Sequence, residues 1–147
     1  MEEDKEITKS VRLDEKDWFL QSLVRTVTGT DHRIGMTFLT GGLLVSGYVV
    51  SGHKYFEAIA KLYSSKEEVQ QSIANLAEGY LPNESGEILA MQDLPAFIHL
   101  QDAKYYNTFG QPIPGKEGVW WRGTLLNING YNFGVLGFPS RDDQVEQ

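Results

Sequence analysis

Two adjacent glycines, Gly41 and Gly42, separate two apolar runs and constrain the fold of this chain most strongly. Residues 34–40 place Ile, Met and Phe at every second position, and residues 43–50 form a nearly unbroken apolar, β-branched run. Paired glycines between two strand-like runs supply the positive dihedral angles of a tight hairpin turn. Gly47, inside the second run, permits a sharp bend or a bulge. The pattern therefore predicts a strongly bent antiparallel hairpin.

Helical periodicity flanks this hairpin on both sides. Asp14 is predicted to cap a helix that runs to about Thr28, where Gly29 offers a left-handed stop. After Gly52 the apolar residues return at helical spacing in two further segments, the second of which ends near Gly79. The sequence therefore predicts an N-terminal helix and a two-helix insertion.

Strand signals resume after the insertion in residues 96–106, 119–128 and 131–138, with an irregular loop at 108–118. Asn129-Gly130, between the last two segments, is the strongest hairpin signal of the chain. Glycines at two further positions, Gly123 and Gly134, are also read as bend positions. Together these elements predict an α+β fold with about five strongly curved antiparallel strands. The strands form either a small bent sheet or a small barrel whose edges close.

Length and composition bound the organisation and the class of the protein. The 147 residues, 41% hydrophobic and 22% charged, fit one globular domain over residues 14–138, with a flexible leader (1–13) and a flexible acidic tail (139–147). The absence of cysteine excludes thiol catalysis, disulfides and thiolate metal sites, and it fits a reducing cytoplasm. No apolar stretch approaches the ~20 residues of a membrane-spanning helix, and the net charge of -7 disfavours a nucleic acid partner.

Few residues of this sequence suggest a catalytic or metal-binding site. The three histidines, His32, His53 and His99, are far apart and match no metal-binding spacing, so neither a metal nor another cofactor is expected. His99 lies between Ile98 and Leu100 in a predicted strand, and we expect a hydrogen-bonded, partly buried imidazole. No nucleophile elbow or phosphate loop occurs. An enzyme is therefore disfavoured, and a hydrolase or metal enzyme built on His99 would need a deep pocket with a perturbed carboxylate.

Trp120, Trp121 and Arg122 form the least ordinary cluster of the sequence. Because strand residues alternate between faces, one indole should enter the core while the other lies on the opposite side. A half-exposed tryptophan beside an arginine can anchor a protein interface or support the stacking of a base, and Tyr105 and Tyr106 would extend such a surface. The alternative is that both indoles only close the core against the first helix.

Five segments form an ordered set over residues 34–138: GGLLVSG at 41–47, YFE at 55–57, FIHL at 97–100, WRG at 121–123 and the closing segment 130–137. In this order they resemble the gas vesicle accessory protein U family. The resemblance implies a non-enzymatic accessory protein of gas-filled protein shells that acts by protein–protein interaction in vesicle assembly or clustering. It also implies a cytoplasmic location on the vesicle surface, contacts with shell or other gas vesicle proteins, and homo-oligomers or weak self-association. Relatives can continue into a longer polar tail, whereas this chain has only the short acidic stretch 140–147, so the contacts are assigned to the folded surface and the leader.

Residues 98–103 and 119–123 also resemble the second motif of Sm-like barrels. The first Sm motif is matched less well, because residues 52–55 and a helical insertion stand where Sm proteins place an RNA-contacting aromatic residue and an asparagine. This second resemblance implies an Sm-like or SH3-like barrel shape. It leaves an Sm-like nucleic-acid-binding protein as the alternative function.

Overall fold

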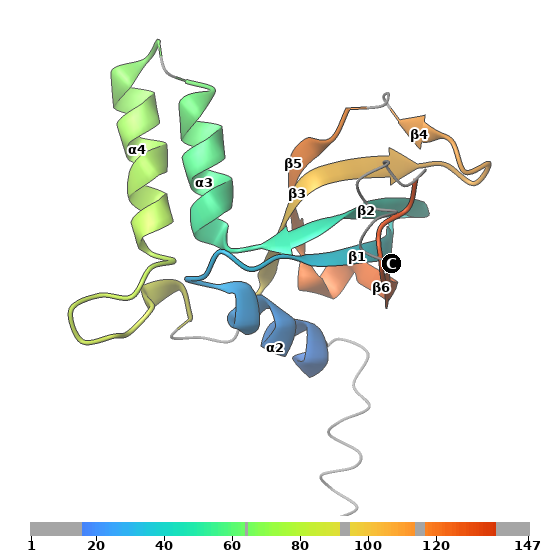
Figure 1. Cartoon of the computed structure of the whole chain (residues 1–147), viewed down its shortest axis with the longest axis horizontal. Coiled ribbons are helices and arrows are strands. Elements are labelled where there is room, and N and C mark those ends of the chain that lie inside the picture. Colours follow the sequence, from blue (N-terminus) through green and yellow to red (C-terminus); the bar gives the residue numbers. More distant parts are fainter. Residues whose placement is uncertain (1–15, 64, 92–94, 114–116, 138–147) are drawn as a thin grey trace, which may run out of the picture.

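A strongly curved antiparallel sheet forms the centre of the computed structural model, which describes residues 16–63, 65–91, 95–113 and 117–137 (Figure 1). The strand order is β4-β3-β2-β1-β6, and β5 also pairs with β3. The six strands are β1 (Ile34–Thr40), β2 (Leu43–Val50), β3 (Phe97–Tyr106), β4 (Pro112–Ile113), β5 (Val119–Thr124) and β6 (Ile128–Phe133). Within the described residues β5 and β6 do not pair with each other. The open bent sheet is therefore the predicted alternative that forms, and the closed barrel is not.

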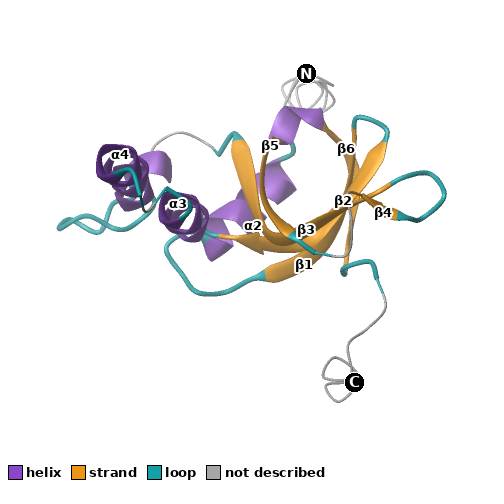
Figure 2. Cartoon of the chain, turned by 90° about the horizontal axis from the view of Figure 1, so that it is seen from above, coloured by secondary structure: helices purple, strands orange, loops and turns teal. Residues whose placement is uncertain are grey.

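Three α-helices surround the sheet: α2 (Trp18–Val27), α3 (Gly52–Lys61) and α4 (Glu67–Glu78). Figure 1 shows α3 and α4 side by side as a helical hairpin at one end of the sheet, with α2 on the other side of the strands. Figure 2 shows the curvature of the sheet around α2. The α+β class, the N-terminal helix and the two-helix insertion are confirmed. The predicted leader (1–13) and tail (139–147) lie outside the described residues.

The central hairpin joins β1 to β2 through two glycines with positive φ angles, 59° at Gly41 and 79° at Gly42. Gly47 lies where β2 and β3 change register. A Cβ at this position would lie 3.0 Å from the Ala103 Cα and from the Gln101 carbonyl oxygen, so the strands could not approach as closely with a larger residue. The register change and the close approach produce the bend that the sequence predicts.

The core lies between α2 and one face of the sheet, which we call the inner face. Leu20, Val24 and Val27 of α2 pack against buried residues that include Met36 and Phe38 of β1. Because these α2 residues recur every three or four positions, they form one apolar face of the helix. Burying this face is the main source of stability for a helix of only ten residues.

The N-terminus of α2 differs from the sequence-based expectation. The cap is Asp17, whose carboxylate accepts hydrogen bonds from the backbone N–H groups of Phe19 (2.8 Å) and Leu20 (3.3 Å), and the predicted cap Asp14 lies outside the described residues. Trp18, the first residue of α2, is 73% exposed although it is apolar. Because Trp18 directly follows the cap, it lies at the very end of the helix and not above the core.

The predicted hairpin at Asn129-Gly130 is wrong. Gly130 lies inside β6 opposite Leu39 of β1, and the chain turns earlier, in a 3-10 helix, Leu125–Asn127. Leu125 is buried in the core and its backbone N–H donates to the Ala96 carbonyl at 2.9 Å. Burial of this side chain fixes the turn and sends β5 and β6 to opposite edges of the sheet.

A short strand also forms in the segment predicted to be an irregular loop. The residues of β4, Pro112 and Ile113, pair with Tyr106 and Tyr105 of β3. Asn107 closes the connection, because its side-chain oxygen accepts from the backbone N–H groups of Phe109 (2.9 Å) and Gln111 (3.0 Å). An Asx-type turn of this kind substitutes for regular pairing and was not recognised from the sequence.

Candidate interaction site on the outer face of the sheet

The face of the sheet opposite α2, which we call the outer face, carries the candidate site. Along β3 the buried Ile98 and Leu100 face the core, while His99 packs against rings of α3 and of the residue Tyr80 that follows α4. Strand alternation places Phe97 and Gln101 on the same side as His99. The regular alternation of a strand therefore holds over residues 97–101 of β3.

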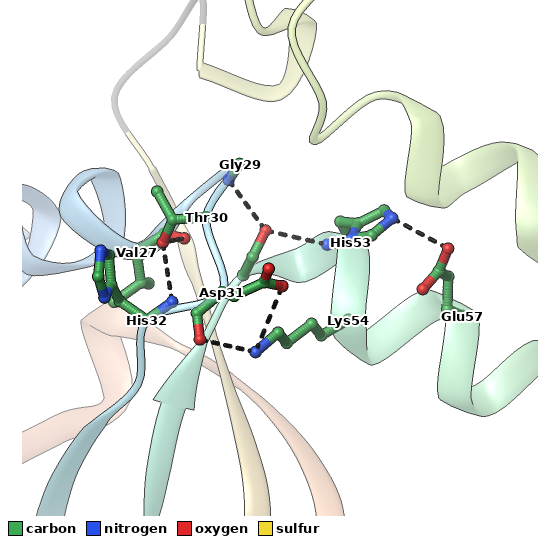
Figure 3. Close-up of polar contacts among 9 residues, drawn as sticks. Val27, Gly29, Thr30, Asp31, His32, His53, Lys54 and Glu57 are labelled. Carbon is green, nitrogen blue, oxygen red and sulfur yellow. Dashed lines mark hydrogen bonds and ion pairs between the residues drawn. The ribbon is translucent and has the colours of Figure 1, made fainter.

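The first turn of α3 is fixed to the loop between α2 and β1. The hydroxyl of Ser51, the α3 cap, accepts from the backbone N–H groups of Gly29 (3.1 Å) and His53 (3.3 Å). Lys54 donates from its Nζ to the Asp31 carbonyl at 2.9 Å and lies 3.8 Å from the Asp31 carboxylate (Figure 3). These contacts hold α3 against one end of the outer face.

His99 is the most enclosed polar residue of the outer face, with 2% of its surface exposed. Its ring centroid lies 4.8 Å from that of Tyr55, 5.7 Å from Phe56 and 5.6 Å from Tyr80. Arg122, the residue opposite His99 in the β3–β5 register, donates from Nε to the His99 Nε2 at 3.1 Å. The imidazole is therefore hydrogen-bonded, as predicted, and buried more completely than predicted.

The surroundings of His99 decide what its imidazole can do. Burial, and secondly the positive charge of Arg122, lower the pKa of His99 to about 3. The ring is therefore neutral near pH 7, and the Nε2 lone pair is already used by Arg122. A group in this state neither donates nor accepts a proton from a substrate, so the geometry gives no support to a hydrolase built on His99.

Arg122 is exposed at the surface and yet held in place. Its guanidinium carbon lies 3.6 Å from the centre of the Phe97 ring, and its Nε is bonded to His99. Stacking on an aromatic ring and one fixed hydrogen bond restrict the planar group, and its two Nη atoms make no hydrogen bond within the described residues. Arg122 is thus oriented in advance for a carboxylate.

Trp120 lies beside Arg122 on the same face of β5 and lines an open groove of about 440 Å³. Its ring packs edge-on against Tyr55 of α3, with centroids 6.5 Å apart. The groove is lined by Lys54, Glu57, Ala58, Lys61, Gln101 and Trp120. It therefore combines an aromatic wall with two lysines and one carboxylate.

The remaining predicted surface residues lie elsewhere. Trp121 packs against the core and covers Gly123, and Tyr105 also packs against the core. Tyr106 is buried, and its hydroxyl donates to the Leu136 carbonyl at 3.0 Å. Strand alternation turns Trp121 inward, and the bulge before Ala103 turns Tyr105 inward as well. Of the predicted surface only Trp120 lines the groove, and Arg122 lies on the same face of β5 outside the groove lining.

Residues 134–137 cover the other end of the outer face. Gly134, with φ of 104°, turns the chain over the sheet, and its N–H donates to the Gly35 carbonyl at 2.8 Å. The Leu136 N–H donates to the Ser46 hydroxyl at 2.7 Å, and Thr37 donates to the Gly134 carbonyl at 2.9 Å. These residues therefore lie on the same face as the groove but do not line it.

The residues that α3 contributes to the groove were not predicted from the sequence. Lys54, Glu57, Ala58 and Lys61 recur at helical spacing on one face of the predicted helix, and this spacing was the available signal. The aromatic residues on the opposite face of the same helix are the stronger signal for packing, so the polar face was read as exposed to solvent. Only packing of α3 on β3 and β5 brings the lysines next to Trp120.

Fold and site together define an α+β protein with a basic, aromatic groove. Within the described ranges no group of three or more His, Asp or Glu residues could hold a metal ion, and none of the helices described is long and apolar enough to cross a membrane. The family model described as Gas vesicle protein GvpU-like matches residues 17–136, and the chain belongs to this family. It is therefore a gas vesicle-associated protein. No curated protein and no solved structure matches the chain.

Proposed function

We propose that this chain is a non-enzymatic gas vesicle accessory protein that acts by protein–protein interaction in vesicle assembly or clustering. The observation that carries the proposal is the family match over residues 17–136, which spans all the described strands and helices. Its partners in this proposal are shell proteins or other gas vesicle proteins, together with further copies of itself. Its place is the cytoplasm, at the vesicle surface.

The outer-face groove supplies the contact surface in this proposal. Tryptophan and arginine are the residue types that most often dominate the binding energy of protein interfaces. Trp120 and Arg122 are both fixed by neighbouring side chains, so little conformational entropy is lost when a partner binds. With Lys54 and Lys61 across the groove, the surface favours an acidic partner segment.

Co-sedimentation with purified gas vesicles tests the proposal. Trp120→Ala should reduce the affinity by more than about tenfold, because truncation of a residue that dominates an interface costs about 2 kcal/mol or more. Trp18→Ala is the matched control, since Trp18 is an exposed indole at the start of α2, on the other side of the sheet. Trp121→Ala is unsuitable, because Trp121 packs against the core.

Arg122 needs a conservative variant, because its removal would also leave His99 without its hydrogen bond. Arg122→Lys keeps the charge and loses the planar bidentate group, so a weaker interaction is expected. Equal co-sedimentation of the unmodified chain, Trp120→Ala and Arg122→Lys would contradict the proposed surface. Binding of labelled RNA at low salt, lost in the same variants, would instead favour the Sm-like alternative.

A further inference from the structure

We propose that residues 138–147, which we call the C-terminal segment, dock into the groove between α3 and β5 of the same chain. This inference goes beyond the proposed function, and the docking does not depend on it, since both partners are parts of one molecule. The segment contains Asp142, Asp143 and Glu146 against the single Arg141, a formal charge of -2. The groove lining carries two lysines, Lys54 and Lys61, and one carboxylate, Glu57.

The chain leaves the described residues on the face where the groove opens. Gly137 lies next to Tyr106, because a Cβ on this glycine would be 3.3 Å from the Tyr106 hydroxyl. The preceding residue, Leu136, is bonded to that hydroxyl and to Ser46 of β2. Residues 134–137 thus deliver the C-terminal segment onto the outer face.

The distance to the groove is within reach of the segment. Tyr106, at the exit point, and Gln101, in the groove lining, lie five residues apart on β3. At the rise of a β-strand this separation is about 17 Å. Ten residues span up to about 33 Å when extended. The leader, by contrast, joins α2, which packs on the inner face.

Charge and chemistry favour this occupant. Lys104 lies opposite Ser46 in the β2–β3 register, between the exit point and the groove, and Lys61 and Lys54 line the groove itself. Lys54 also contacts Asp31, so Lys61 is the main cation that the groove lining offers to the segment. These cations are set on one face of a chain whose formal net charge is -7. Glu57, the one carboxylate of the groove lining, offers a counterpart for Arg141. Val145 is the only aliphatic residue of 140–147 and suits the indole wall of Trp120.

Because the C-terminal segment and the groove belong to the same chain, weak contacts are sufficient for docking. A short linker holds the segment near the groove at an effective concentration in the millimolar range. Exposed charge pairs each contribute little, so a free peptide of the same sequence would bind poorly. Docking within one chain therefore requires no tight interface.

A spin label tests the docking in the full chain. The protein contains no cysteine, so Gln144→Cys provides a single attachment site within the segment. In the ¹⁵N spectrum at low ionic strength, the Trp120 indole N–H should lose several-fold in intensity. The Trp18 indole N–H, on the other side of the sheet, should keep its intensity. Added salt should restore the Trp120 signal, because it screens exposed charges.

Charge variants identify the contact. Lys61→Glu should reduce the loss at Trp120, because it replaces an attraction by a repulsion. Lys66→Glu makes the same change of charge just before α4, outside the groove lining, and should leave the loss unchanged. Neutralising the segment with Asp142→Asn, Asp143→Asn and Glu146→Gln should abolish the loss. An unchanged Trp120 signal in the spin-labelled chain, or equal effects of Lys61→Glu and Lys66→Glu, would overturn the proposal.

Two further outcomes separate this inference from its alternatives. If a loss of comparable size also appears when spin-labelled ¹⁴N chains are mixed with unlabelled ¹⁵N chains, the occupant is the segment of a second copy and the proposal is wrong. If an oligouridylate shifts the groove signals while the spin label leaves Trp120 unaffected, the groove binds nucleic acid and the proposal is also wrong. Failure of the chain to bind gas vesicles would contradict the proposed function and leave the spin-label result intact.

Discussion

Lowering the pH should destabilise this protein through His99, and the effect can be worked out from its surroundings. The pKa of the imidazole is about 3 in the folded chain and 6.5 at its ordinary value, which we take for the unfolded chain. Between these values the unfolded chain binds a proton that the folded chain does not. The contribution to stability is therefore complete above about pH 6.5 and is lost progressively as the pH falls toward 3.

The expected size follows from linkage. Well below pH 6.5 the free energy of unfolding falls by about 1.4 kcal/mol per pH unit for one such group, and between pH 7 and pH 5 the loss sums to about 2 kcal/mol. His99 is 2% exposed, so solvent screening does not reduce this figure greatly. A change of this size is a large fraction of the stability of a small domain.

Urea unfolding at pH 7, 6 and 5, followed by tryptophan fluorescence, measures this loss. His99→Gln is the reference, because the amide oxygen can still accept from the Arg122 Nε and the side chain does not titrate. The unmodified chain should lose about 2 kcal/mol relative to His99→Gln between pH 7 and pH 5. All other titratable groups are common to both proteins and cancel in the difference.

A constant difference between the two proteins across this pH range would refute the reasoning. The same conclusion would follow if the His99 imidazole signal in the NMR spectrum of the folded chain titrated near pH 6.5. The NMR measurement remains informative if His99→Gln does not fold.

Two further predictions concern local geometry. Gly52→Ala should destabilise the protein by about 1–3 kcal/mol in thermal unfolding, because a Cβ at this position would overlap the Tyr80 ring. Gly79→Ala, at a helical φ of -63° with only an ordinary contact, should cause no loss and serves as the control. Asp17→Ala should cost about 1–2 kcal/mol through loss of the α2 cap. Burial, the hydrogen bond to Asp17 and the charge of Asp17 raise the pKa of Tyr131 to about 12, so Asp17→Ala should also lower this pKa. An unchanged Tyr131 pKa, measured by NMR, would contradict the contact between the two side chains.

Local signals in the sequence were sufficient for much of the fold. Gly41 and Gly42 fix the central turn by their own backbone conformations, and the alternation around His99 separates the two faces of β3. Asn129-Gly130 carried an equally strong local signal and failed, because burial of Leu125 fixes the turn three residues earlier. A turn propensity of this kind competes with the packing of the whole core, which the sequence does not display.

Only part of the candidate site could be predicted from the sequence in the same way. Trp120 and Arg122 were selected as unusual residues, and strand alternation places them on one face. Alternation alone does not say which indole faces the core, and Trp121 is the one that does. The lysines of α3 belong to the site only because the helix packs on β3 and β5, which begin at least 36 residues later in the sequence.

Docking of the C-terminal segment predicts how salt should affect partner binding, if the proposed function also holds. An acidic partner must displace the segment, so Lys54 and Lys61 exchange one set of carboxylates for another. Salt weakens both sets of attractions, and the two effects oppose each other in the measured affinity. The variant Asp142→Asn, Asp143→Asn, Glu146→Gln has no such compensation. Its affinity for purified gas vesicles should therefore be higher at low salt and fall more steeply with salt than that of the unmodified chain. Parallel salt dependences for the two proteins would mean that the segment and the partner do not share the groove.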